Sequence, residues 1–147
     1  MDRIISVDDN LQKIKKFNIN HTVLVTGDDY TLHRFYTTIN KCVIDKTCIK
    51  ILYELHDTEQ CQGYDYVIFS YTWQILQACK IEEYLQILKD IAKFSQIIIW
   101  LYIPDIDPIP YLQDILNIDQ VLKIIIIKNN SNMEADIQAL YYSFYET

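Results

Sequence analysis

Two carboxylates near the start of the chain could act as catalytic groups or metal ligands. They follow an apolar run. Residues 22–26 (Thr-Val-Leu-Val-Thr) are β-branched or apolar, and Gly27, Asp28 and Asp29 come directly after them. This pattern predicts a buried strand, a tight turn and the start of a helix, which is where α/β domains keep their chemistry.

A second pair of acids follows a later apolar run. Residues 96–103 read as a strand, and Asp105 and Asp107 come just after it. The carboxyl ends of parallel strands meet at one edge of a sheet, and a hard cation such as Mg²⁺ favours carboxylate oxygens there. The candidate metal ligands are therefore Asp28, Asp29, Asp105 and Asp107. The more common role of such acids is to cap helices and to end strands.

The end of another predicted strand, residues 48–55, carries Glu54 and is followed by His56. His56 is the best placed of the three histidines, although a histidine without a nearby nucleophile is more often structural. The candidate catalytic residues are Asp28, Asp29 and His56. Glu54 lies where methyltransferase-like Rossmann domains hold a ribose, so Gly27 and Glu54 are the candidates for cofactor binding.

Glycine is scarce, and this bears on cofactors. The chain has two glycines, Gly27 and Gly63. Loops that cradle phosphates need several glycines, because backbone N–H groups must approach the phosphate closely. We therefore expect no dinucleotide or nucleoside-triphosphate site of the familiar kind, and no cofactor.

Helical and strand patterns alternate along the 147 residues. The predicted strands span residues 23–26, 48–55, 64–71, 96–103 and 121–128, and the predicted helices span 11–17, 30–44, 82–94 and 133–144, with a helix or loop over 110–117. The strands are continuously apolar, which is typical of a parallel sheet covered on both faces. We expect one domain over residues 1–147, with residues 1–20 as a helical lead-in. The fold is predicted to be a three-layer α/β/α sandwich with about five mainly parallel strands.

Part of this pattern resembles the GDSL/SGNH hydrolases. The Gly27-Asp28-Asp29 turn is similar to the Gly-Asp-Ser block of that family, whose serine is the nucleophile. The run 64–71 resembles the strand before the family's Gly-x-Asn-Asp block, and the run that ends at Pro104 resembles a later strand. The resemblance covers roughly residues 21–128 and implies an α/β/α hydrolase-like scaffold.

The chain departs from that family at the residues that do the chemistry. Asp29 stands at the position of the serine, and a carboxylate there cannot act as the activated nucleophile. Residues 71–73 (Tyr-Thr-Trp) stand where Gly-x-Asn would supply oxyanion donors. No Asp-x-x-His pair follows the last predicted strand. The resemblance therefore implies a degenerate relative without the catalytic machinery.

Charge and composition exclude some partners. The net charge is −7, and no stripe of Lys and Arg offsets phosphate repulsion, so we expect no nucleic-acid partner. No apolar run reaches the roughly 20 residues of a membrane span, and no signal peptide is recognised. We expect an intracellular (cytoplasmic) protein without a membrane partner, and four cysteines that are reduced, buried thiols.

These observations favour a non-catalytic interaction or structural module, a pseudoenzyme within a larger assembly. Dense aromatics at residues 141–145 either seal the sheet or form a partner surface. We therefore expect a protein partner or a homo-oligomer, and the composition (12 tyrosines against two glycines) is of the kind that AT-rich genomes, some of them viral, encode. The alternatives are an SGNH-like esterase or a Mg-dependent phosphoryl-transfer enzyme at the acidic strand ends, and a SAM-dependent methyltransferase-like domain.

Overall fold

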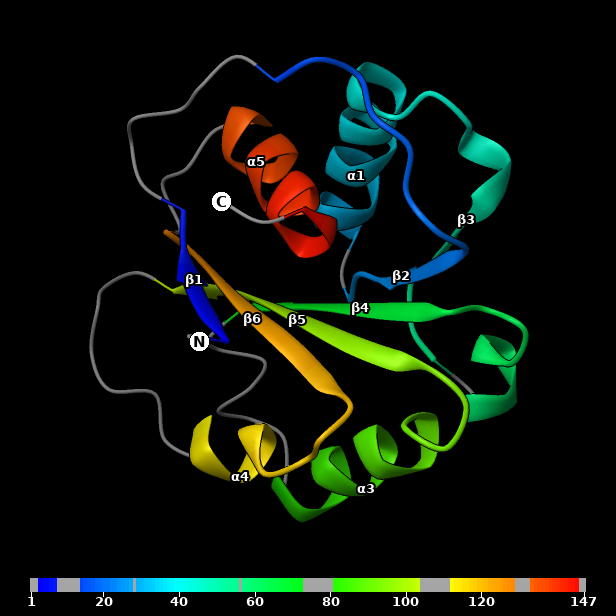
Figure 1. The fold of residues 1–147 in the computed structure, drawn as a ribbon, viewed down its shortest axis with the longest axis vertical. Helices are drawn as coiled ribbons and strands as arrows, with labels where there is room; N and C mark the ends of the chain where they lie inside the picture. The colour runs from blue at the N-terminus through cyan, green and yellow to red at the C-terminus, as the bar shows by residue number, and fades with distance from the viewer. Residues whose placement is uncertain are drawn as a thin grey trace.

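A six-stranded parallel sheet forms the centre of the molecule (Figure 1). The computed structural model describes residues 3–7, 14–27, 29–55, 57–72, 81–103, 112–128 and 133–145. The strands are β1 (Ile4–Ser6), β2 (Thr22–Val25), β3 (Ile49–Leu52), β4 (Tyr66–Thr72), β5 (Gln96–Ile103) and β6 (Val121–Lys128). Their order across the sheet is β1-β6-β5-β4-β2-β3, and each recorded pairing is parallel.

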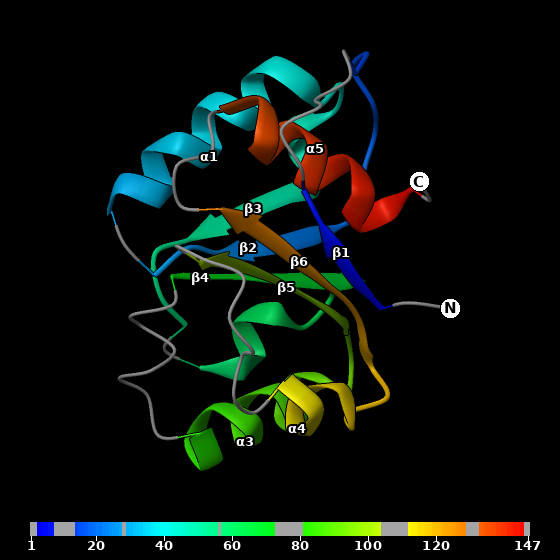
Figure 2. The ribbon, with the colours of Figure 1, turned by 90° about the vertical axis from the view of Figure 1, so that its left-hand side faces the viewer.

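Helices cover both faces of this sheet (Figure 2). On one face lie α1 (Asp29–Cys42) and α5 (Met133–Phe144), side by side. On the other lie α3 (Ile81–Ile91), α4 (Leu112–Leu116) and the one-turn 3₁₀ helix η2 (Thr58–Cys61), while a second 3₁₀ helix, η1 (Lys46–Cys48), leads into β3. The predicted α/β/α sandwich with a parallel sheet is confirmed, with six strands instead of about five.

The alternation of helix and strand explains this topology. The connection between two parallel strands must cross one face of the sheet, and these crossovers are right-handed. When the chain starts to add strands on the other side of β2, the crossover helices therefore move to the opposite face. Without β1, the order is 2-1-3-4-5 in chain terms, which is the flavodoxin-like doubly wound order. The reversal lies between β2 and β4.

The apolar strands supply two cores, one on each face. Ile68, Ile98 and Trp100 face α1 and α5, whereas Val67 and Phe69 face α3. Each of these five side chains is at most 1% exposed. Both faces of the central strands are therefore buried, which is why their sequences are continuously apolar.

The predicted lead-in helix is wrong in the part that the structure describes. Residues 14–20 carry no helix, and Phe17 instead pairs with Val43 in an isolated parallel bridge. The Phe17 N–H donates to the Cys42 carbonyl at 2.8 Å, and the Phe17 ring packs edge-on against Tyr141. Burial of one aromatic ring therefore outweighs the weak helical pattern of this short segment.

β1 was not predicted, because three residues give little periodic signal. It pairs with β6 at the sheet edge, where Ile5 lies opposite Ile125. The Arg3 guanidinium fixes it by donating to the carbonyls of Leu116 at 2.6 Å and Ile118 at 3.1 Å. Leu116 is the last residue of α4 and Ile118 lies just beyond it, so neither carbonyl has an intrahelical donor.

The C-terminal aromatics seal the sheet. Tyr141 and Tyr145 stack on each other with centroids 4.9 Å apart, and Phe144 packs edge-on against Tyr66 at 5.2 Å. Of this group, Tyr145 is the most exposed, at 38%. The aromatics of residues 141–145 therefore serve mainly the core, and the partner surface must be sought elsewhere.

The described cysteines, Cys42, Cys48 and Cys61, are free thiols. Cys42 and Cys61 are buried, and burial raises the pKa of each to about 11. Both are therefore protonated at neutral pH, as the expectation of buried, reduced thiols requires. Cys48 is half-buried at the end of η1, just before β3.

Candidate functional site: the carboxyl edge of the sheet

The reversal between β2 and β4 places a crevice position at the carboxyl edge, where doubly wound folds bind ligands. Gly27 makes the turn from β2 to α1 with φ of 82°, a conformation that favours glycine. Its N–H donates to the Tyr53 carbonyl at 2.7 Å, which ties this turn to the end of β3. α1 then begins at Asp29, whose carboxylate lies in the first turn.

The structure describes only some of the residues that the sequence singled out. Four of them lie outside the described ranges: Asp28, His56, Asp105 and Asp107. Asp29 and Glu54 are exposed, on α1 and just after β3 respectively. Within the described ranges, no group of three or more His, Cys, Asp and Glu side chains gathers as a metal site would require. The predicted convergence of the acidic strand ends therefore stays a prediction.

Three other side chains converge at this edge and form what we call the buried triad: Arg34, Tyr102 and Asp136. They come from α1, β5 and the first turn of α5. Asp136 is fully buried and accepts hydrogen bonds on both carboxylate oxygens, on Oδ2 from Arg34 Nε and on Oδ1 from the Tyr102 hydroxyl at 2.8 Å. The triad thus joins two helices to a central strand.

Burial governs the protonation of the triad. It raises the pKa of Asp136, while the charge of Arg34 and the hydrogen bonds of Tyr102 and Arg34 oppose that shift. Burial, followed by the Asp136 charge, raises the pKa of Tyr102 well above its usual value, so the phenol stays protonated and donates. For Arg34, burial acts to lower the pKa, but Asp136 more than compensates, and the pKa is raised.

Aromatic rings enclose the guanidinium of Arg34. Its central carbon lies 6.0 Å from the ring centroid of Tyr30 and 5.8 Å from that of Tyr102. The hydroxyl of Ser70, near the end of β4, is buried and makes no hydrogen bond within the described residues. The Arg34 side chain keeps only 14% of its surface exposed. A charge so enclosed is desolvated and is held by its partner Asp136.

This geometry is suited to holding the fold. The carboxylate that could act as a base is bonded on both oxygens, and the nearest cation is bonded to that same carboxylate. A buried pair of this kind fixes the register of the elements that carry it. Here it fixes α1 against α5 over the end of β5.

Sequence reasoning missed the triad because its members are far apart in the chain. Arg34 and Asp136 are 102 positions apart, and no local motif joins them. One signal was present: Asp136 shares a helical face with Ala139, Leu140 and Ser143, all of them buried. A carboxylate in such a stripe requires a buried partner.

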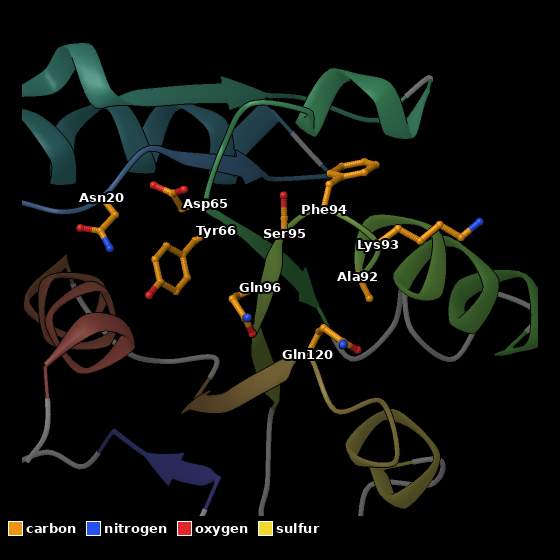
Figure 3. A pocket seen from close by; sticks show the side chains of 9 residues that line it. All are labelled: Asn20, Asp65, Tyr66, Ala92, Lys93, Phe94, Ser95, Gln96 and Gln120. Carbon is orange, nitrogen blue, oxygen red and sulfur yellow. The ribbon is translucent and has the colours of Figure 1, made fainter.

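The opposite, amino edge of the sheet is open (Figure 3). A shallow hollow of about 500 Å³ lies there, at the starts of β4, β5 and β6, and we call it the amino-edge hollow. Its lining residues are Asn20, Asp65, Tyr66, Ala92, Lys93, Phe94, Ser95, Gln96 and Gln120. The strand register sets Tyr66 beside Gln96, and the Gln120 carbonyl accepts from the Ile97 N–H at 2.8 Å.

Comparisons of this chain with protein-family profiles, with curated proteins and with solved structures found no match. None of the helices in the described ranges combines the length and the apolar character that a bilayer crossing requires. Function must therefore be argued from the residues themselves.

Proposed function

We propose that this chain is a non-catalytic interaction module that self-associates through the side of the molecule built by α1 and β3. The observation that carries this proposal is the distribution of exposed large apolar side chains in the described ranges. The four most exposed lie between residues 30 and 53: Tyr30 at 73%, Ile44 at 60%, Tyr36 at 52% and Tyr53 at 44%. The other three are each 38% exposed: Ile87 on α3, Phe94 in the turn after α3, and Tyr145 just after α5.

An edge strand lies in the middle of this surface. In the described residues, β3 pairs with β2 on one side only, and its residues are all half-buried. An edge strand presents unpaired N–H and C=O groups to a partner strand. We define the α1–β3 surface as β3 together with Tyr30, Tyr36, Ile44 and Tyr53. In Figure 1, β3 lies at the right and α1 lies above the sheet.

Charge favours a second copy as the partner. Between residues 29 and 54 the chain has four basic and three acidic residues, but Asp136 neutralises Arg34, which leaves three of each sign, whereas the whole chain carries −7. Two copies therefore meet little net charge repulsion over this surface. A two-fold axis would set the two β3 strands antiparallel and join the sheets, with the exposed aromatics packed on either side.

The closed triad supports the non-catalytic part of the proposal. At the ligand-binding edge, the buried acid Asp136 and the enclosed cation Arg34 are bonded to each other, with Asp136 occupied on both oxygens. The α1–β3 surface is therefore the candidate for binding a partner. Apolar patches with exposed tyrosines are typical of such surfaces.

Sedimentation velocity tests the proposal with two matched isoleucines. We expect the wild-type chain to sediment as a dimer, and Ile44→Asp to sediment as a monomer that still unfolds in one cooperative thermal transition, because a charge then faces the partner's apolar surface. Ile87→Asp, on α3, should remain dimeric. A wild-type chain that is monomeric at every concentration, or a dimer that both variants leave intact, would overturn the proposal. Asp29→Ala should leave association unchanged, whereas loss of an esterase or Mg²⁺-dependent activity in Asp29→Ala would favour the enzymatic alternative.

A further inference from the structure

We propose that the amino-edge hollow binds a saccharide. The argument goes beyond self-association, since the hollow lies at the starts of β4, β5 and β6, away from β3. Its volume of about 500 Å³ lies within the range of ~300–1,000 Å³ that is usual for small-molecule sites. The chemistry of its lining selects the ligand class.

Carboxamides dominate the polar lining. The side chains of Asn20, Gln96 and Gln120 line the hollow together with the carboxylate of Asp65, and none of these four side chains bonds to another described residue. A carboxamide both donates and accepts, and a carboxylate accepts on two oxygens. Sugar hydroxyls also do both, and neighbouring hydroxyls present donors and acceptors at the spacing of one amide or carboxylate group. The lining therefore complements a polyhydroxylated ligand.

Two aromatic rings border the polar groups. Phe94 is 38% exposed, and its ring extends from the turn after α3 (Figure 3). Tyr66 is half-buried and held edge-on against Phe144 at 5.2 Å. An aromatic face offers apolar area at little cost in conformational entropy. The C–H face of a sugar ring can lie on such a surface while its hydroxyls reach the amides.

The charges of the lining argue against anionic ligands. Lys93 points away from the other labelled side chains in Figure 3, and its ammonium lies 3.5 Å from the Asp90 carboxylate. The lining thus carries one carboxylate, Asp65, and one ammonium, Lys93, and offers an anion no excess of positive charge, in a chain of net charge −7. Phosphate-bearing ligands and nucleic acids would be repelled. A neutral saccharide meets no such penalty.

A titration followed by ¹⁵N–¹H correlation NMR tests the ligand class on the full chain. The probes are maltotetraose and tri-N-acetylchitotriose, with tetraglycine and inorganic phosphate as separate arms. We expect at least one saccharide to move the amide signals of residues 20, 65, 96 and 120 in a saturable way, with a Kd on the order of 1 mM, as suits a shallow site. Signals that do not move with either saccharide, or that move with tetraglycine or phosphate instead, would overturn the proposal.

Single variants then locate the binding. Gln96→Ala and Phe94→Ala each remove a group that is already exposed, so both proteins should fold, as thermal unfolding will show. Each is expected to weaken saccharide binding by about tenfold, the size of one lost hydrogen bond or packed ring. Gln113→Ala, an exposed glutamine on α4 outside the hollow, is the matched control. Equal affinity in Gln96→Ala, Phe94→Ala and the wild type would contradict the assignment of this site.

Discussion

The two ends of the same parallel sheet use their polar residues in opposite ways. At the carboxyl edge, Asp136 is fully buried and bonded on both oxygens by Arg34 and Tyr102. At the amino edge, the side chains of Gln96 and Gln120 line an open hollow and bond to no other described residue. At the end that usually binds ligands in doubly wound folds, the three triad side chains are thus bonded to one another.

This difference shows that the strand order fixes where a ligand site can form, but not which side chains are present there. Both edges follow from the same strand order. The carboxyl edge receives the starts of α1 and α5, and their side chains close over the sheet as the triad. The amino edge receives the turn after α3 and the loops before β2 and β6, whose short polar segments leave space between them.

Removing the acid of the triad gives the largest expected effect and tests the closed end directly. Asp136→Ala should lower the free energy of unfolding by about 3–5 kcal/mol, because Arg34 and the Tyr102 hydroxyl lose their acceptor in a buried site. Urea unfolding followed by circular dichroism measures the change. The matched control is Glu134→Ala, which removes an exposed acid from the same turn and should stay within about 0.5 kcal/mol of wild type.

Equal denaturation midpoints for Asp136→Ala and Glu134→Ala would show that the triad does not hold the fold. The polar groups at the carboxyl edge would then not be explained by a role in stability, and the contrast with the amino edge would be lost.

A smaller effect should appear in the pH dependence of stability. Burial raises the folded-state pKa of Asp136 above its unfolded value, so protonation is favoured by folding. The stabilisation is fully present below the unfolded pKa and is lost as pH rises through the folded pKa. Relative to Asp136→Asn, which does not titrate here, the wild-type chain should therefore lose stability as pH rises above about 4, the usual pKa of an aspartate side chain.

Urea titrations of both proteins at several pH values from about 4 upwards measure their free energies of unfolding. If the stability of the wild type relative to Asp136→Asn instead increases with pH, the charge of Arg34 outweighs burial and holds the pKa of Asp136 below its usual value. The triad would then be a strong ion pair in the folded state.

Much of the fold could be predicted from the sequence, because burial on two faces leaves a strong local signal. The bounds of β5, β6 and α5 match the predicted ranges residue by residue. The signal failed where contacts between distant residues decide the structure. Phe17 is extended because its ring packs against Tyr141, and β1 exists because Arg3 reaches the carbonyls after α4.

The polar features were harder to predict for the same reason. The Gly27 turn stands where the sequence places it, because a strand, a glycine and a helix are adjacent in the chain. Arg34 and Asp136 meet only after the sheet has formed, and the lining of the hollow comes from four separate segments. In the aromatic C-terminus, the sequence left two roles open, and packing against Phe17 and Tyr66 selects the inward one.

The most direct test of the closed carboxyl edge replaces the whole triad by apolar side chains, in the variant Arg34→Met, Tyr102→Phe, Asp136→Leu. Replacing all three members together leaves none of them without its partner in the triad. We expect the free energy of unfolding of this variant to lie within about 2 kcal/mol of the wild-type value. We also expect the variant to sediment as the same dimer. A variant that folds equally well but has lost association would contradict a purely structural triad, and would place the functional surface at the carboxyl edge after all.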